Sequence, residues 1–134
     1  MHMIHPNDRI LVIAPHADDE LIGLGGSLLK WKNMGCKIKI ILVACSDIYM
    51  HHKKSVVSAE VRLSEFSEIC DLISTEDFIN LSMQDSKLDM SPISELVNKL
   101  DNITMEFNPS VFIYPEPSYH QDHQYVNKAC TASL

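Results

Sequence analysis

The sequence predicts a three-layer α/β sandwich of the Rossmann-like type, with a mainly parallel sheet between two layers of helices. Four short apolar runs alternate with segments whose apolar residues recur at helical spacing. Two polar clusters rich in histidine and aspartate directly follow the first and the fourth of these runs. Right-handed crossovers usually leave the first strand in the centre of such a sheet, so we expect the strand order 3-2-1-4.

The first half of the chain predicts two strands and the helix that joins them. The run 9–14 (RILVIA) is aliphatic throughout, as in a strand that is buried on both faces. Apolar residues at helical spacing predict a helix over 21–34, and Gly35 is suited to end it. The run 36–44 (CKIKIILVA) begins with alternation and becomes continuously apolar, which predicts the second strand. We expect the polar segment 45–54 to be a loop.

The second half of the chain continues the same alternation. Apolar positions at helical spacing predict an amphipathic helix over 55–73, with a serine near its start. Residues 78–81 form a short third strand in this interpretation, and a helix with proline in its first turn covers 92–107. The sequence Asn-Pro breaks that helix before the fourth strand, 110–114 (SVFIY). We expect another helix to begin after His123.

Length and composition indicate a single domain over residues 1–134. Apolar residues make up 46% of the chain and charged residues 22%, close to the averages for globular proteins, which argues against disorder and coiled coil. The formal net charge of -7 argues against nucleic acid as a partner, because binding to a phosphate backbone depends on clustered lysine and arginine. Carboxylates gathered in a cleft would instead attract a cation.

The cysteines and the N-terminal residues predict a cytoplasmic protein with no membrane span. The cysteines are far apart in the chain and form no CxxC pair, so we interpret them as reduced thiols. Residues 1–7 lack the basic stretch and the long apolar run of a signal peptide. The apolar segment 21–29 is too short to cross a bilayer.

The two polar clusters are the segments in which we expect the chemistry of this protein. Residues 15–20 (PHADDE) follow the first predicted strand, and residues 116–123 (EPSYHQDH) follow the fourth. In the predicted sheet these strands are neighbours at the point where the chain reverses direction, so the clusters would face each other across one crevice. Imidazoles and carboxylates without a thiolate suit zinc, and iron(II) accepts the same ligands. The clusters contain more candidate ligands than one open zinc site needs.

The motifs PHADDE, GLGGS and HQDH, in this order, resemble the PIG-L (LmbE-like) N-deacetylase family. The signature of that family reads AHPDDE and later HxDH, and this chain has Ala17 where the signature usually has proline. The segment 62–65 (RLSE) and Asp85 also match the family pattern, so the resemblance extends over nearly the whole chain. Each motif is moderately specific alone, and their combination is strong.

The resemblance implies a division of roles among the candidate ligands. His16, Asp19 and His123 would bind zinc, and Asp18 would act as general base on the water held by that ion. This arrangement agrees with general chemistry, since zinc acidifies its water and a neighbouring carboxylate that does not bind the metal can take the proton.

The resemblance also implies roles for residues around the ion. His120 would stabilise the negative charge that grows on the amide oxygen during attack. Asp122 would hold this histidine in its charged and oriented form. Arg62 would contact the substrate or buttress the site.

The resemblance predicts a hydrolase that removes the N-acetyl or N-acyl group from a glucosamine-type amino sugar or glycoconjugate. Family members usually continue beyond HxDH, whereas this chain stops eleven residues after His123, so we expect a domain truncated at its C-terminus. The exposed strand edge and apolar surface of a shortened sheet would favour a homo-oligomer.

Two alternatives to a deacetylase stay open on the sequence alone. A truncated domain of this fold could be a metal- or sugar-binding module with weak catalysis. A phosphotransfer domain that uses magnesium also places aspartates after its first strand, but that chemistry needs no histidine ligands.

Overall fold

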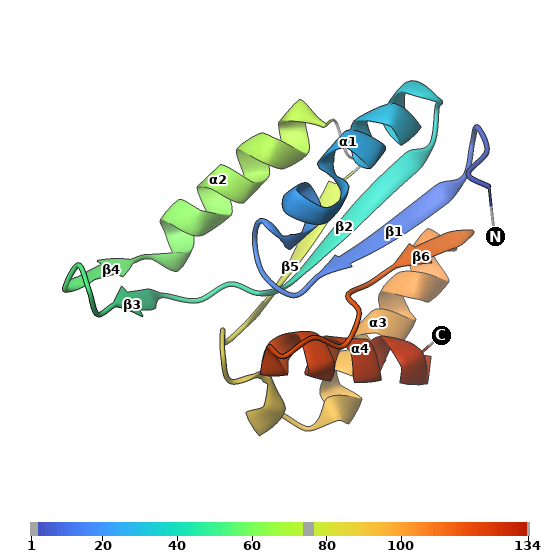
Figure 1. Cartoon of the computed structure of the whole chain (residues 1–134). Helices are drawn as coiled ribbons and strands as arrows, with labels where there is room; N and C mark the ends of the chain where they lie inside the picture. Colours follow the sequence, from blue (N-terminus) through green and yellow to red (C-terminus); the bar gives the residue numbers. More distant parts are fainter. Residues whose placement is uncertain (1–2, 74–76, 134) are drawn as a thin grey trace.

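A four-stranded parallel sheet forms the centre of the fold, in the order β5-β2-β1-β6. The computed structural model describes residues 3–73 and 77–133, and Figure 1 shows the sheet running through the middle of the molecule. These strands correspond to the four predicted ones, so the expected order 3-2-1-4 is confirmed. The strand bounds are β1 Arg9–Ala14, β2 Lys37–Ala44, β5 Asp77–Met83 and β6 Val111–Ile113.

Helices cover both faces of the sheet and complete the predicted three layers. Helices α1 and α2 lie on one face, and α3 and α4 lie on the other (Figure 1). Their bounds are α1 Asp19–Asn33, α2 Ala59–Leu72, α3 Ile93–Phe107 and α4 Gln121–Ser133. A short 3-10 helix, η1 Leu88–Met90, precedes α3.

Burial on both faces explains the continuous apolar runs of the central strands. Successive side chains of a strand point to opposite faces. In β1, Ile10 and Val12 join the apolar cluster under α1 and α2, whereas Leu11 and Ile13 join the cluster under α3 and α4. All four side chains are almost completely buried, at 0% to 3% exposed. A polar residue at any of these positions would lose its water without gaining a partner.

Local capping residues fix where the helices begin and end. Gly35 follows α1 with φ of 90°, a left-handed conformation that glycine adopts without a steric penalty, as the sequence predicts. At the start of α2, the Ser58 hydroxyl accepts a hydrogen bond from the backbone N–H of Val61. Asn108 ends α3 in a left-handed conformation, the usual alternative to glycine at this position.

The predicted loop and helix between β2 and β5 are partly wrong. Part of the expected loop 45–54 and the first residues of the expected helix 55–73 pair as an antiparallel hairpin, β3 Ile48–Met50 with β4 Ser55–Val57. Helix α2 therefore begins only at Ala59. The hairpin projects from one end of the molecule (Figure 1). The last helix also differs from its prediction, because α4 begins at Gln121 and contains His123 in its first turn.

All four cysteines are buried and free, which agrees with the interpretation as reduced thiols. Burial raises the pKa of the Cys130 thiol to about 12, so this group stays protonated and unreactive at neutral pH. Among the described residues, no helix is both long and apolar enough to cross a membrane.

A pair of leucine variants would test the placement of the core. Leu100 on α3 is 1% exposed, whereas Leu72 at the end of α2 is 73% exposed. We expect Leu100→Ala to lower the free energy of unfolding by about 2 to 5 kcal/mol, because the truncation leaves a cavity. Leu72→Ala should change it by less than about 0.5 kcal/mol. Urea denaturation of both variants measures the contrast, and equal effects would contradict this core.

Candidate metal centre

The structure brings the two polar clusters together at one edge of the sheet. Strands β1 and β6 are hydrogen-bonded neighbours, so the segments that leave their carboxyl ends enter the same crevice. His16 follows β1 by two residues, and Asp19 is the first residue of α1. His123 reaches the same place from the first turn of α4.

Three donor atoms in this crevice have the spacing of ligands around one ion. The carboxylate oxygen Oδ2 of Asp19 lies 3.4 Å from Nδ1 of His16 and 3.3 Å from Nε2 of His123. All three donor atoms lie within 4.8 Å of one another. Ligands about 2.0 to 2.1 Å from a tetrahedral zinc are about 3.3 Å apart, which both separations from the Asp19 oxygen match. One oxygen and two imidazole nitrogens also leave a fourth position open.

Short-range backbone contacts fix the loop between β1 and α1. The backbone N–H of His16 donates to the Asp19 carboxylate over 2.9 Å, so this carboxylate closes the loop as well as facing the two rings. Asp18, between them, has φ of 92°, a strained conformation for a residue with a side chain. Its carboxylate makes no capping bond to α1, and the residue is exposed.

Asp122 contacts a histidine in addition to the one expected. Its carboxylate is 0% exposed and lies 2.7 Å from Nε2 of His16. The backbone N–H of Ser86 donates to the same oxygen over 2.7 Å. The family resemblance implies that this carboxylate holds His120, and donor atoms of His16, His120 and Asp122 all lie within 4.8 Å of one another. The backbone N–H of Asp122 also donates to Nδ1 of His120 over 3.2 Å.

The contact with Asp122 determines how His16 faces the crevice. A histidine that donates from Nε2 to a carboxylate keeps the lone pair of Nδ1 free, and metal-binding histidines are commonly held in this way. The other ring nitrogen of His16, Nδ1, is the one that lies beside Asp19. Asp122 is therefore placed to orient a ligand of the candidate ion.

The protonation of His16 and Asp19 reflects their mutual contact. Burial by itself lowers the pKa of His16, but hydrogen bonds and charge from Asp19 and Asp122 outweigh it, so that the pKa is raised. Burial by itself raises the pKa of Asp19, but the hydrogen bonds from His16 and the nearby imidazoles lower it overall. A divalent cation would compete with the His16 proton, so its binding should release protons.

His120 lies beside the three donors without belonging to their set. Its ring centroid lies 4.8 Å from that of His16 and 5.4 Å from that of His123. The side chain is exposed, in contrast to the partly buried rings of His16 and His123. Because its Nδ1 accepts a backbone hydrogen bond, its Nε2 is the nitrogen available to carry a proton.

A nearly buried ion pair supports the edge of the site. Two nitrogens of the Arg62 guanidinium donate to the two oxygens of Asp85, each over 2.9 Å, with side-chain exposures of 12% and 8%. Asp85 also accepts from the backbone N–H and the hydroxyl of Ser46, and Arg62 donates to the Ser46 carbonyl oxygen. The hydrogen bond to Asp85 is the main cause of a raised Arg62 pKa, to which Asp18 also contributes. These contacts favour a buttressing role for Arg62.

No sequence motif pointed to Ser46 and Ser86, which join the site to the loops around it. Ser46 is the second residue after β2 and binds Asp85 from the loop after β5. Ser86 offers only its backbone N–H to Asp122, a contact that any residue except proline could make. No side-chain pattern could therefore have predicted the role of Ser86.

These features define a class of parallel α/β proteins. In this class, two imidazoles and a carboxylate converge beside the strand at which the chain reverses its direction across the sheet. The chain belongs to the PIG-L family, described as GlcNAc-PI de-N-acetylase, whose model matches residues 11–134. This match confirms the resemblance that the sequence motifs indicated.

Two deacetylases are among the proteins that this chain resembles. A probable N-acetyl-alpha-D-glucosaminyl L-malate deacetylase 2 from Bacillus cereus is 26% identical over 133 residues, which cover 94% of this chain and 60% of the relative. The N,N'-diacetylchitobiose deacetylase from Pyrococcus horikoshii superimposes with a TM-score of 0.81 at 26% identity, covering 94% of this chain and 49% of that one. The chain thus spans about 60% of the length of the curated relatives that it matches.

The fold also occurs in a protein with another reaction. GalB, the 4-carboxy-2-hydroxymuconate hydratase from Pseudomonas putida, superimposes with a TM-score of 0.79 at 14% identity, covering 94% of this chain and 55% of that one. This likeness shows a shared fold alone.

The contact between Asp122 and His16 predicts a loss of metal affinity on substitution. We expect Asp122→Asn to weaken zinc binding by about 10- to 100-fold, because an amide holds the imidazole less firmly than a carboxylate. Competition with a chromophoric chelator measures the affinity. Asp89→Asn on η1 is the control, since Asp89 is exposed. Equal affinities in the two variants would contradict the orienting role.

The ion pair of Arg62 and Asp85 predicts a stability that depends on pH. Burial by itself raises the pKa of Asp85, but hydrogen bonds from Arg62 and Ser46 lower it overall. The pair therefore stabilises the fold above the ordinary aspartate pKa of about 3.9, and this stabilisation is lost as pH falls through the lower folded value. We expect Asp85→Asn to cost about 3 kcal/mol at pH 7 and progressively less below about pH 4.

Urea denaturation from pH 7 down to pH 3 measures this difference between wild type and Asp85→Asn. The Asp89→Asn variant provides the comparison for loss of an exposed carboxylate. A difference between wild type and Asp85→Asn that stays constant over this range would contradict the assignment.

Proposed function

We propose that this protein is a zinc-dependent hydrolase that removes the N-acyl group from a glucosamine-type amino sugar or glycoconjugate. The observation that carries the proposal is the convergence of His16, Asp19 and His123, with the His120 ring beside them. Membership of the PIG-L family supports amide hydrolysis. The names of the two deacetylases above support N-acetylated sugars as the substrate class.

His16, Asp19 and His123 would hold the ion, with zinc as our choice and iron(II) as the alternative for the same ligands. Bound zinc supplies a Lewis acid that acidifies water and polarises an amide carbonyl. Two imidazole nitrogens and one carboxylate would leave a fourth position of a tetrahedral ion open, which a hydrolytic centre needs and a purely structural centre lacks.

Asp18 would act as the general base. It neighbours the candidate ligand Asp19 in the chain, is exposed, and makes no capping bond to α1. The carboxylate would take a proton from the attacking water and deliver it to the departing amine. The strained backbone at φ of 92° is consistent with a residue held in place for a reaction.

His120 would stabilise the oxyanion that forms from the amide carbonyl. Its Nδ1 accepts the backbone N–H of Asp122, which leaves Nε2 to donate toward the substrate. Its exposure allows a substrate to approach, while its contact with the His16 ring keeps it beside the donor set. A fixed donor aimed at a developing negative charge commonly contributes 100-fold or more to a rate, about 3 kcal/mol.

The variant Asp18→Asn would test the general base. We choose asparagine because it tolerates the left-handed backbone of this position better than alanine does. We expect the rate of acetate release from N-acetylglucosamine derivatives to fall by about 100- to 10,000-fold. Zinc content, measured by elemental analysis, should stay unchanged. The variant Asp19→Asn should instead lose both zinc and activity.

The same measurements separate an enzyme from a binding module. A module that only binds metal or sugar would contain zinc but release no acetate even as wild type. Asp89→Asn, far from the donors in the chain and exposed, controls for nonspecific effects of losing a carboxylate. Retention of full activity in Asp18→Asn would exclude this residue as the base.

A further inference from the structure

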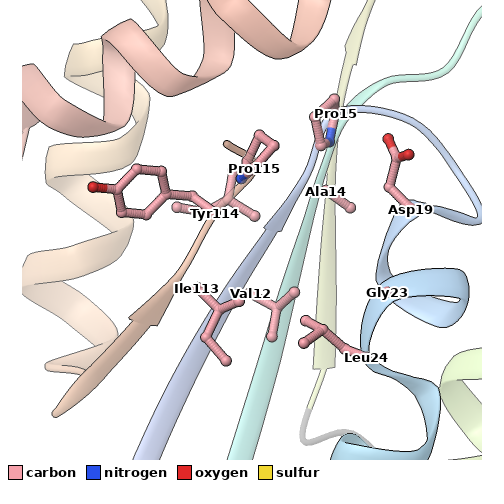
Figure 2. Close-up of a pocket in the computed structure, with 10 residues that line it drawn as sticks. Val12, Ala14, Pro15, Asp19, Gly23, Leu24, Ile113, Tyr114 and Pro115 are labelled. Carbon is pink, nitrogen blue, oxygen red and sulfur yellow. The ribbon is translucent and has the colours of Figure 1, made fainter. Parts of the chain in front are cut away.

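An apolar groove opens beside the candidate metal centre, on the sheet face that α1 covers. It has a volume of about 190 Å³ and lies between β1, the start of α1 and the end of β6. Figure 2 shows its lower end between Val12, Ile113 and Leu24, and Asp19 beside Pro15 at its upper end. The groove therefore runs from a candidate ligand of the ion down along the sheet.

The chemistry of the groove excludes most polar ligands. Its lining is almost entirely aliphatic, with Ala14 and Pro115 in addition to the residues at the lower end. Asp19 is the charged residue among those that line it, and its carboxylate is committed to His16. The Tyr114 ring points away from the other lining side chains (Figure 2). A phosphate would be repelled here, and sugar hydroxyl groups would lose their hydrogen bonds to water.

The size of the groove exceeds the needs of an acetyl group. An apolar cavity of about 150 Å³ in another protein is large enough to bind benzene, so about 190 Å³ accommodates a group of roughly six carbons. The methyl of an acetyl group would occupy only a small part of this space. A longer aliphatic chain would remove more of the apolar lining from water.

We propose that this groove binds the acyl chain of the substrate, and that it suits linear chains of about six carbons better than acetyl. The inference rests on the hydrolase function proposed above. In that reaction the amide C–N bond breaks and a C–O bond to water forms. The acyl group leaves as a carboxylate, and both protons of the water end on the released amine. The acyl chain is attached to the reacting carbon, and a carbonyl near the ion held by Asp19 lies at the mouth of the groove.

Two glycines of α1 provide a matched pair of variants. A Cβ built on Gly23 or on Gly26 meets no atom within 4 Å, so a larger side chain fits at either position. Gly23 lines the groove, whereas Gly26, about one turn further along the helix, does not. Leucine favours a helix more than glycine does, so neither variant should impair folding. Gly23→Leu would narrow the groove, and Gly26→Leu is its control.

The experiment measures the binding of acetate, butyrate and hexanoate to the zinc-loaded protein by calorimetry. We expect affinity to rise by up to about fourfold with each added methylene that the groove buries. Gly23→Leu should lower the affinity for hexanoate by about tenfold and the affinity for acetate by less than about twofold. Gly26→Leu should change neither affinity. The kcat/KM values for N-acetyl and N-hexanoyl glucosamine should follow the same pattern.

The other outcomes distinguish failure of the acyl-binding proposal from failure of the proposed hydrolase function. Hydrolysis that does not depend on chain length would overturn the groove as an acyl site and leave the hydrolase intact. Tighter binding of hexanoate that Gly23→Leu abolishes, without hydrolysis of either amide, would support the groove and contradict the hydrolase. If a second copy of this chain covers the groove, sedimentation would show a dimer that Gly23→Leu dissociates, and the proposal would be wrong.

Discussion

The buried carboxylate of Asp122 is the contact on which the arrangement of the candidate centre depends. It reaches from α4 to Nε2 of His16 at the end of β1, and it also accepts a backbone hydrogen bond from Ser86. Three segments that are distant in the sequence thus meet at one group that has no contact with water. A buried charge without partners would be strongly destabilising, so its partners must be kept in place. The same contact presents the opposite nitrogen of the His16 ring to Asp19.

The sequence predicted the sheet well because its strands are buried on both faces. Runs such as 9–14 and 36–44 leave a continuous apolar signal, and their order in the sheet follows from crossover handedness. The hairpin of β3 and β4 gave no such signal. Its strands have three residues each, and Tyr49 and Val56 are exposed, so neither burial nor alternation marks them. Short exposed strands are determined by pairing, which local sequence does not reveal.

The candidate site was predictable in its members and less so in its contacts. His16, Asp19 and His123 lie in motifs whose spacing and position after strands predict convergence, and the structure brings them together. The contact of the Asp122 carboxylate with His16 was not predicted, because motif spacing does not say which way a residue faces at the start of a helix. The shared fold of a hydratase shows that the layers of the sheet do not determine a reaction. The donor residues at the edge of the sheet, and not its layers, carry the information about the reaction.

The pairing of β1 with β6 has a consequence for the order of folding events. Ile10 lies opposite Val111, so forming this contact closes a loop of about 100 residues, which is slow because the chain entropy must be lost first. His16 emerges early during synthesis, but its partners on α4 are made only after that loop is complete. The first helix, the hairpin and α2 can assemble on β1 and β2 beforehand. A ribosome-bound chain that ends before His123 would therefore have much of its core but would lack one of the three candidate ligands.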